Sequence, residues 1–400
     1  MRGISMQSPS NVAAASPRSL FLELLPITLT VFVGFLTLGL ALPVLPLHLQ
    51  SALKMSPLVI GTVIASQFAA ALLTRAWAGS MVDTRGAKRA VVIGLALGAC
   101  SGLAYLASLG APAGYGAVAV LIGARLLLGC AESLVVTGAL GWGVGLAGPN
   151  NAGKVMAWVG IAIYGAYAAG APLGVFVYGR FGFAGIALAS VIIPLLALAI
   201  VARVPALAPS HKARVPFYKV LRAVWLPGLG LALSSMGFCA ITAFVALLFS
   251  SRGWGDAALA FTSFGVAFIG ARLLFGHLPD TLGGARVALV CVLIEAAGQL
   301  LMWSAPTALL ACLGAAITGF GYSLAFPGFG VEAVRRAPPQ SRASAMGAYV
   351  AFLDISLAVC GPLAGLLAMR WDVGSVYLAG ALVVASSALV ALRLMLTRPA

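Results

Sequence analysis

Long apolar runs separated by short polar connections fill most of the sequence. Each run has about 20 residues or more, the length that a helix needs to cross a hydrocarbon layer about 30 Å thick. The runs do not alternate between polar and apolar residues, as the strands of a membrane barrel do, and residues 191–201 are apolar throughout. The pattern therefore predicts twelve membrane-spanning helices, at residues 26–49, 58–82, 88–110, 114–138, 155–178, 183–203, 222–249, 257–279, 285–304, 306–331, 343–368 and 373–396.

The composition agrees with a protein surrounded by lipid. Hydrophobic residues make up 62% of the 400 residues and charged residues only 8%, whereas a soluble protein carries about 25% charged residues. No phosphate-binding loop, zinc-protease histidine pair or nucleophile elbow occurs in the sequence. We therefore expect an all-α membrane protein that is not an enzyme and holds no cofactor and no metal.

Basic residues fall mainly in every second connection. The 24 lysines and arginines contribute to a net charge of +15, but 17 of them lie in one set of alternate connections, 4 in the other set and 3 within spans. Lysine and arginine accumulate in the cytoplasmic connections of membrane proteins. The distribution thus predicts that both termini are cytoplasmic, which requires an even number of spans, and it argues against nucleic acid as a partner.

One polar phrase occurs in both halves of the chain. Residues 79–89 and 276–286 both read G-x-x-x-D-x-x-G-x-x-[KR] and lie 197 residues apart. Each copy falls in a short connection, where glycines permit a tight turn and an aspartate can lie near a helix N-terminus. Such a repeat predicts two related halves that rock against each other, with the motif as part of a gate. The motif residues are Gly79, Asp83, Gly86 and Arg89 in the first copy and Gly276, Asp280, Gly283 and Arg286 in the second.

Further matches support a division into two halves. Residues 129–134 match 319–324, and residues 170–174 match 360–364, both at an offset of 190 residues. The longest polar connection is rich in proline and basic residues and reads as a linker. The predicted organisation is a disordered cytoplasmic tail at residues 1–20, a six-helix half at 21–204, a linker at 205–221 and a second six-helix half at 222–396.

Ionisable side chains within spans are candidates for substrate or proton binding, because charges inside a membrane are costly and tend to be functional. Arg125 and Glu132 lie seven residues apart in span four, so both are expected on one side of the helix, about 10 Å apart. Asp354 lies in span eleven and is a candidate proton carrier. The alternative for all three is a structural ion pair or hydrogen bond.

Other polar groups in the spans are weaker candidates. Arg75 and Arg272 lie near the ends of spans two and eight and are expected to snorkel or to pair at a gate. Glu295 in span nine is expected to pack or to lie at the lipid boundary. Tyr164 and Tyr322 are candidates for lining a cavity, with hydrogen bonding between helices as the alternative.

Two glycine–proline segments and six cysteines complete the list of unusual features. Gly170, Pro172 and Gly174 in span five, and Gly361 and Pro362 in span eleven, are expected to kink their helices or to let them approach closely. The cysteines show no metal-binding spacing, and we expect them to act as small apolar residues, neither disulfides nor metal ligands. They are Cys100, Cys130, Cys239, Cys291, Cys312 and Cys360.

These motifs resemble those of the major facilitator superfamily over essentially the whole chain. Residues 79–89 resemble the family motif between spans two and three, and Leu121-x-x-x-Arg125-x-x-x-Gly129 resembles the span-four motif, whose arginine is tied to proton coupling in many antiporters. Residues 165–174 resemble the antiporter motif of span five, but the core here is Gly-Ala-Pro-Leu-Gly where the family has Gly-Pro-x-x-Gly-Gly. Shorter phrases, such as residues 352–357, resemble the YhhS/YfcJ-type bacterial transporters.

The resemblance implies both a fold and a function. It implies that spans one, four, seven and ten line a cavity, with Arg125 and Glu132 facing or flanking it. It implies that spans two, five, eight and eleven form the interface between the halves, with Asp83 at the gate and Asp354 in the interface.

We therefore expect a monomeric secondary transporter of the bacterial inner membrane, whose partners are protons, membrane lipid and a small-molecule substrate. The expected activity is proton-coupled efflux of a small organic solute by alternating access. A proton-coupled uptake symporter for a sugar or organic acid has the same expected architecture. A non-transporting membrane sensor or scaffold is the alternative from another class.

Overall fold

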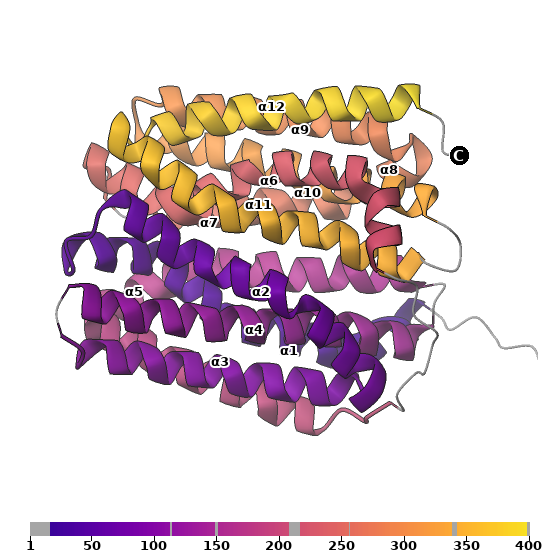
Figure 1. Ribbon diagram of the computed structural model, residues 1–400, viewed down its shortest axis with the longest axis horizontal. Coiled ribbons are helices and arrows are strands. Elements are labelled where there is room, and N and C mark those ends of the chain that lie inside the picture. The colour runs from indigo at the N-terminus through magenta and orange to yellow at the C-terminus, as the bar shows by residue number, and fades with distance from the viewer. Residues whose placement is uncertain are drawn as a thin grey trace, which may run out of the picture.

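The chain folds as a bundle of long helices. The computed structural model describes residues 17–112, 114–148, 151–207, 217–255, 257–337 and 342–397, and every regular element in these ranges is a helix apart from single turns. The helices lie side by side along the long axis of the molecule (Figure 1). They are α1 (Pro17–Ser51), α2 (Pro57–Arg85), α3 (Ala87–Leu109), α4 (Tyr115–Ala147), α5 (Ala152–Ala202), α6 (Phe217–Arg252), α7 (Ala258–Phe275), α8 (Leu278–Thr281), α9 (Gly284–Ser304), α10 (Ala308–Arg336), α11 (Arg342–Arg370) and α12 (Ser375–Leu396).

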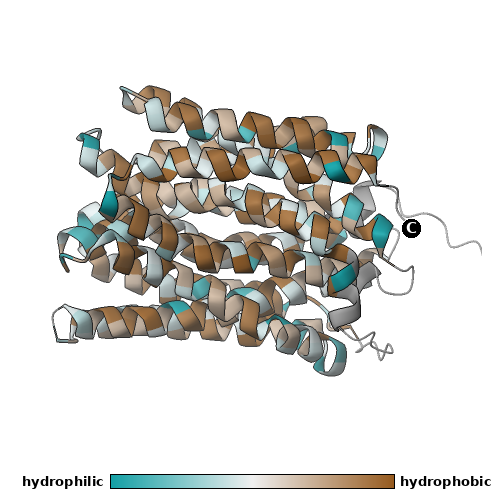
Figure 2. Ribbon diagram, turned by 45° about the horizontal axis from the view of Figure 1, so that its top comes forward, coloured by the Kyte–Doolittle hydropathy of each residue, from teal (hydrophilic) through white to brown (hydrophobic). Residues whose placement is uncertain are grey.

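Apolar residues cover the helices along their lengths, and polar residues gather at the two ends of the bundle (Figure 2). Eleven helices in the described ranges are long and apolar enough to cross a membrane. One of them, the 49-residue segment Lys154–Ala202 of α5, is about twice as long as one crossing requires. Gly182, with φ 61° and ψ −161°, is non-helical and divides α5 into two spans. The described ranges therefore contain the twelve spans that the apolar pattern predicts.

Several expected boundaries shift by a few residues. Helix α1 begins at Pro17, so residues 17–20 of the expected tail are helical, and residues 1–16 lie outside the described ranges. Helix α6 begins at Phe217, so residues 217–221 of the expected linker are helical, and residues 208–216 also lie outside the described ranges.

The repeated motif forms a tight turn in both copies. Gly86 has φ 91° and Gly283 has φ 95°, values in the left-handed region that side-chain-bearing residues rarely adopt. The first copy continues α2 to Arg85, whereas the second copy ends α7 at Phe275 and places the short α8 before the turn. Pro279 lies in the first turn of that short helix, a position where its missing N–H group leaves no helical hydrogen bond unmade.

The two halves of the bundle lie one above the other in Figure 1, with α1–α5 below and α6–α12 above. Helices α2 and α11 meet across the boundary, where a Cβ atom at Gly61 would overlap the carbonyl group of Gly361. Helices α5 and α7 meet there as well, and the Thr262 hydroxyl donates to the Ala168 carbonyl at 3.0 Å. Small residues thus allow close backbone contact between helices of different halves.

The glycine–proline segment of α5 serves a similar purpose inside one half. A Cβ atom at Gly170 would lie 2.8 Å from the Cα atom of Gly39 in α1, and a Cβ atom at Gly174 would overlap the Leu40 carbonyl. The helix continues through Pro172, and Gly182 is its non-helical residue. The segment therefore brings α1 and α5 close together and does not break the helix at the proline.

A bulky residue at the contact of α2 and α11 will destabilise the protein. Gly361→Val adds atoms where the Gly61 carbonyl lies, and such overpacking costs about 1–3 kcal/mol or more. We expect a lower midpoint of thermal unfolding and a lower yield of monodisperse protein, both measured by size-exclusion chromatography after heating. Gly347→Val is the matched control in the same helix, because a Cβ atom at Gly347 meets nothing within 4 Å. Equal losses in the two variants would contradict the packing explanation.

Candidate functional site

An ion pair joins the two halves of the molecule. The Nε atom of Arg75 in α2 donates to Oδ2 of Asp354 in α11 at 2.6 Å. The two side chains are 15% and 4% exposed. Removing one partner of a buried pair leaves an uncompensated charge, which is strongly destabilising. Of the two behaviours expected for Arg75, snorkelling and pairing, the structure shows pairing, and it joins Arg75 to one of the predicted proton carriers.

Glu132 lies within the first half, against α2. The Nε2 atom of Gln67 donates to Oε2 of Glu132 at 2.6 Å. A cavity of about 20 Å³, lined by Thr37 and Glu132 among others, lies beside this pair, and this volume is enough for about one water molecule. The Thr37 hydroxyl and Oε1 of Gln67 are buried and have no hydrogen-bond partner among the described residues. The surroundings of Glu132 therefore contain spare polar atoms and space for water.

Arg125 points to another neighbour of α4. Its Nη1 atom donates to the Tyr105 hydroxyl in α3 at 3.4 Å, and the residue is only 3% exposed. Among the described residues, no ion pair joins Arg125 to Glu132. Although the seven-residue spacing suggested a common face, the two side chains find their partners on different helices, α3 and α2.

An aromatic cluster lies where the two halves meet. It consists of six side chains from α5, α6, α7 and α10, namely Tyr164, Tyr167, Phe238, Phe264, Phe268 and Tyr322. Tyr164 stacks on Phe268 with ring centroids 3.7 Å apart, and Tyr322 stacks on Phe238 at 5.5 Å. The structure thus brings together Tyr164 and Tyr322, the two predicted cavity residues. The phenylalanines were missed, because a phenylalanine in an apolar span has the same sequence signal as one that faces lipid.

Arg272 lies beside this cluster and does not extend toward the end of the bundle. Its Nη2 atom donates to the Ser323 carbonyl in α10 at 2.6 Å, and its guanidinium carbon lies 5.1 Å from the centroid of the Phe268 ring. Contacts of this kind between a guanidinium and an aromatic face are favourable. Of the two behaviours expected for Arg272, the structure therefore does not show snorkelling, and no ion pair found in the described ranges includes Arg272.

The exposed motif residues lie in the connections at the end of the bundle. Asp83, Arg89, Asp280 and Arg286 are exposed. Lys88, next to Arg89, donates to the carbonyl groups of Ala202 and Val204 at 3.1 and 2.6 Å and so satisfies the C-terminal end of α5. The gate position that the resemblance implies for Asp83 stays a prediction.

Glu295 occupies the interior of the second half and not the lipid boundary. It is 0% exposed, and neither carboxyl oxygen has a hydrogen-bond partner among the described residues. A Cβ atom at Gly237 of α6 would overlap its Oε1 atom. Gln299, one turn further along α9, donates to the Gly237 carbonyl at 3.3 Å and to the Thr318 hydroxyl at 3.2 Å. Glu295 therefore belongs to a second buried polar cluster, between α6, α9 and α10.

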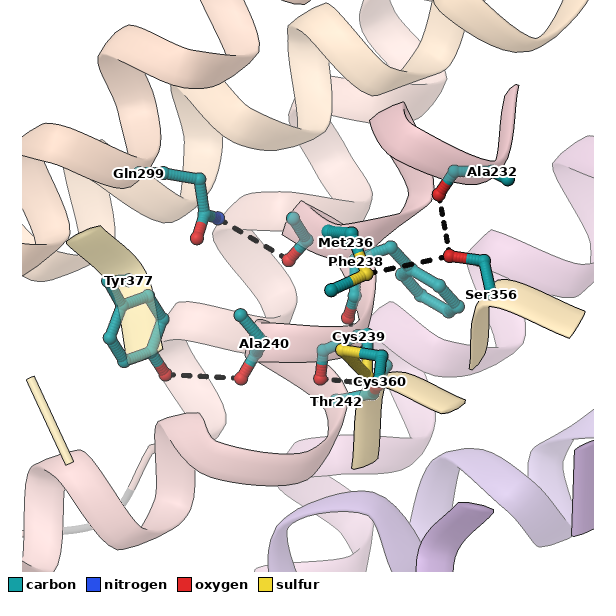
Figure 3. Close-up of a disulfide and its surroundings, with 11 residues drawn as sticks. Ala232, Met236, Phe238, Cys239, Ala240, Thr242, Gln299, Ser356, Cys360 and Tyr377 are labelled. Atoms are coloured by element: carbon teal, nitrogen blue, oxygen red, sulfur yellow. Dashed lines mark hydrogen bonds between the residues drawn. A yellow bond between two sulfur atoms is a disulfide. The ribbon is translucent and has the colours of Figure 1, made fainter. Parts of the chain in front are cut away.

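Two of the six cysteines form a disulfide. Cys239 in α6 and Cys360 in α11 are bonded, with their Cα atoms 6.5 Å apart (Figure 3). Next to them, the Ser356 hydroxyl donates to the Ala232 carbonyl at 2.5 Å, and the Tyr377 hydroxyl donates to the Ala240 carbonyl at 3.2 Å. The prediction that all six cysteines are unpaired is therefore wrong. The 121-residue separation of the two cysteines carries no spacing signal, and only the folded bundle places α6 beside α11.

Counting free thiols will test this disulfide. Cys100, Cys130, Cys291 and Cys312 are free. We expect the denatured protein to take up four N-ethylmaleimide groups without reduction and six after reduction, as measured by intact mass. The double variant Cys239→Ser and Cys360→Ser should take up four groups under both conditions. Six groups on the unreduced wild-type protein would contradict the pairing.

Comparisons with known proteins agree with this architecture. The family model described as Major Facilitator Superfamily matches residues 27–258 and 228–400. An "Uncharacterized MFS-type transporter" of Salmonella typhimurium is 46% identical over 355 residues, covering 88% of this chain and 92% of the relative. One from Pseudomonas aeruginosa is 42% identical over 360 residues, covering 89% of each.

Solved structures share the fold at low sequence identity. The nucleoside transporter NupG aligns with TM-score 0.73 and 15% identity, covering 94% of this chain and 100% of the other. A D-xylose–proton symporter aligns with TM-score 0.74 and 17% identity, covering 91% and 96%. At these identities the likeness concerns the fold alone.

Proposed function

Because the chain belongs to the major facilitator superfamily of membrane transporters, we propose that it is a proton-coupled secondary transporter that exports a small organic solute by alternating access. The observation that carries the proposal is the Arg75–Asp354 ion pair, which joins α2 of one half to α11 of the other. A titratable carboxyl in that position couples the binding of a proton to the contact between the two halves.

The coupling step follows from the charges of the pair. While Asp354 is ionised, its attraction to the Arg75 guanidinium holds α2 against α11. A proton on Asp354 removes that attraction and leaves the guanidinium free to find another partner. Protonation therefore changes the free energy of the arrangement in which α2 and α11 are in contact relative to that of the arrangement in which they are apart. A ligand can shift a two-state equilibrium only by such a difference. In this proposal, proton binding favours separation of the halves at this contact.

Glu132 supplies a second proton-binding group, in the half that contains Arg75. Its bond from Gln67 and the neighbouring cavity with the Thr37 hydroxyl provide hydrogen-bond partners for either protonation state. Gln67 and Arg75 lie on the same helix, α2, so a change at Glu132 is transmitted to the ion pair through the position of that helix.

Placement in the membrane follows from the basic connections. We place the end of the bundle that carries the repeated motif and the C-terminus in the cytoplasm, because lysine and arginine accumulate there. In this proposal the protein works as a monomer in the bacterial inner membrane, with both termini in the cytoplasm. The outer surfaces of the helices in both halves face lipid.

Flux measurements in proteoliposomes test the proposal. Purified protein is reconstituted with a pH-sensitive dye inside, and sugars, amino acids and organic acids are added one class at a time under an imposed pH gradient. We expect the transport of one class of solute to move protons across the membrane, and the solute to be driven against its own concentration gradient. An uncoupler should abolish this uphill movement. Solute flux that is identical with and without the pH gradient would contradict proton coupling. Proton movement in the same direction as the solute would replace export by uptake symport.

A further inference from the structure

Arg75 and Arg272 occupy equivalent positions in the two halves, 197 residues apart and four residues before the repeated motif. The Nε atom of Arg75 donates to Asp354. The residue that lies 190 positions before Asp354, at the offset that relates the eleventh span to the fifth, is Tyr164. The second half therefore repeats the arginine as Arg272. At the position in the first half that is equivalent to Asp354, however, the chain has a tyrosine in place of a carboxylate that would neutralise Arg272.

The Arg272 guanidinium keeps an unused donor. Its buried Nε atom has no hydrogen-bond partner among the described residues, and none of the ion pairs found in the described ranges includes Arg272. A cation within a membrane span is costly without an anion, and such residues mark substrate or ion pathways. The free atom of Arg272 is its Nε, and the same atom of Arg75 donates to the Asp354 carboxylate.

Hydroxyl groups and aromatic rings surround this donor. The Arg272 guanidinium lies over Phe268, Tyr164 stacks on that same ring, and the centroid of Tyr322 lies 6.2 Å from that of Tyr164. Tyr322 is 0% exposed, and its hydroxyl interacts with the Tyr164 hydroxyl and with Ser235. A planar guanidinium edge next to phenolic hydroxyls suits a carboxylate, which can accept two parallel N–H bonds and a third from a hydroxyl.

We propose that Arg272, Tyr164 and Tyr322 bind the carboxylate of an organic anion whose apolar body lies among Phe238, Phe264 and Phe268. The inference rests on the proposed transport of a small organic solute and names its chemical class. Tyr164 belongs to α5 in the first half, while Arg272 and Tyr322 belong to α7 and α10 in the second. The rings now stack on one another, so the anion enters between them when the halves separate.

Equilibrium binding to the purified full chain tests the site without any gradient. The probes are benzoate, phenylacetate and indole-3-acetate, each compared with its uncharged amide, and binding is measured by the ligand-dependent rise in the midpoint of thermal unfolding. We expect at least one carboxylate to bind and its amide to bind at least about 10-fold more weakly. Arg272→Gln should weaken carboxylate binding by about 10- to 100-fold and Tyr322→Phe by about 5-fold.

Matched variants keep the test decisive. Arg180→Gln is the control, because Arg180 is exposed and its guanidinium lies over Phe176 at 5.9 Å, outside the cluster; its binding should equal that of the wild type. If Arg272→Gln does not fold, Arg272→Lys retains the charge without the planar pair of donors and should still weaken binding about 10-fold. Failure of all three carboxylates to bind, equal binding of the amides, or unchanged binding in the Arg272 variants would each overturn the site. Because no proton gradient is involved, these results are independent of whether proton coupling holds.

Discussion

Asp354→Asn will abolish proton-driven transport and will destabilise the protein. The amide cannot release a proton, so the contact between α2 and α11 no longer responds to pH. The substitution also leaves Arg75 without its anion at a site where the side chains are 15% and 4% exposed. Breaking a buried ion pair from one side costs about 3–5 kcal/mol. Uphill solute flux in proteoliposomes should fall to background, and the midpoint of thermal unfolding should fall with it.

A second substitution separates the two effects. In the double variant Arg75→Gln and Asp354→Asn, neither charge remains, and exchanging a buried ion pair for neutral groups is often close to neutral for stability. We expect the double variant to recover most of the lost stability but not the response to pH. Asp372→Asn, an exposed position beyond the end of α11, is the control and should behave as the wild type. Proton-driven flux in Asp354→Asn at the wild-type rate would remove this residue from the mechanism.

Glu132→Gln will uncouple solute movement from protons while preserving exchange. The new amide side chain can still accept the hydrogen bond that Gln67 donates to Glu132 at 2.6 Å, so the local structure should persist. Without a titratable group at this position, α2 no longer transmits proton binding to the ion pair, so solute should equilibrate across the membrane but should not accumulate. With one proton exchanged per solute, a gradient of one pH unit supports up to about tenfold accumulation. We therefore expect the accumulation ratio to fall from this range in the wild type to about one in the variant.

Counterflow measurements distinguish uncoupling from simple inactivation. Exchange of labelled for unlabelled solute, with no pH gradient, should proceed in Glu132→Gln at a rate within about threefold of the wild type, a difference below about 1 kcal/mol in activation free energy. Glu23→Gln, an exposed position in α1, is the control for the loss of one carboxylate. If Glu132→Gln accumulates solute as the wild type does, Glu132 carries no coupling proton.

The spans and the repeat were predictable because their signals are local. About twenty apolar residues in sequence define a crossing whatever its neighbours are. The repeated spacing alone predicts a tight turn at the glycines at positions 86 and 283, and both adopt positive φ. The division of α5 at Gly182 was likewise expected between two runs that are together too long for one crossing.

The partners of the intramembrane residues were less predictable, because they come from distant parts of the chain. Arg75 and Asp354 are 279 residues apart, and sequence spacing places each on its helix but does not select the partner. The position of Arg272 near a helix end suits either snorkelling or pairing at a gate, and the sequence does not show that its side chain lies against Phe268. Of the two positions expected for Glu295, packing and the lipid boundary, the structure shows packing, because Gly237 and Gly321 lack side chains and leave room for Glu295 in the interior.

The distance between the two halves, measured by pulsed electron resonance between spin labels, tests the central claim most directly. The labels occupy Ser51→Cys at the end of α1 and Arg370→Cys at the end of α11, in a protein whose four free cysteines are replaced. We expect two distances at mildly alkaline pH, with the population of the second distance increasing at mildly acidic pH and prevailing at every pH in Asp354→Asn. A single distance that changes neither with pH nor with the substitution would contradict the claim.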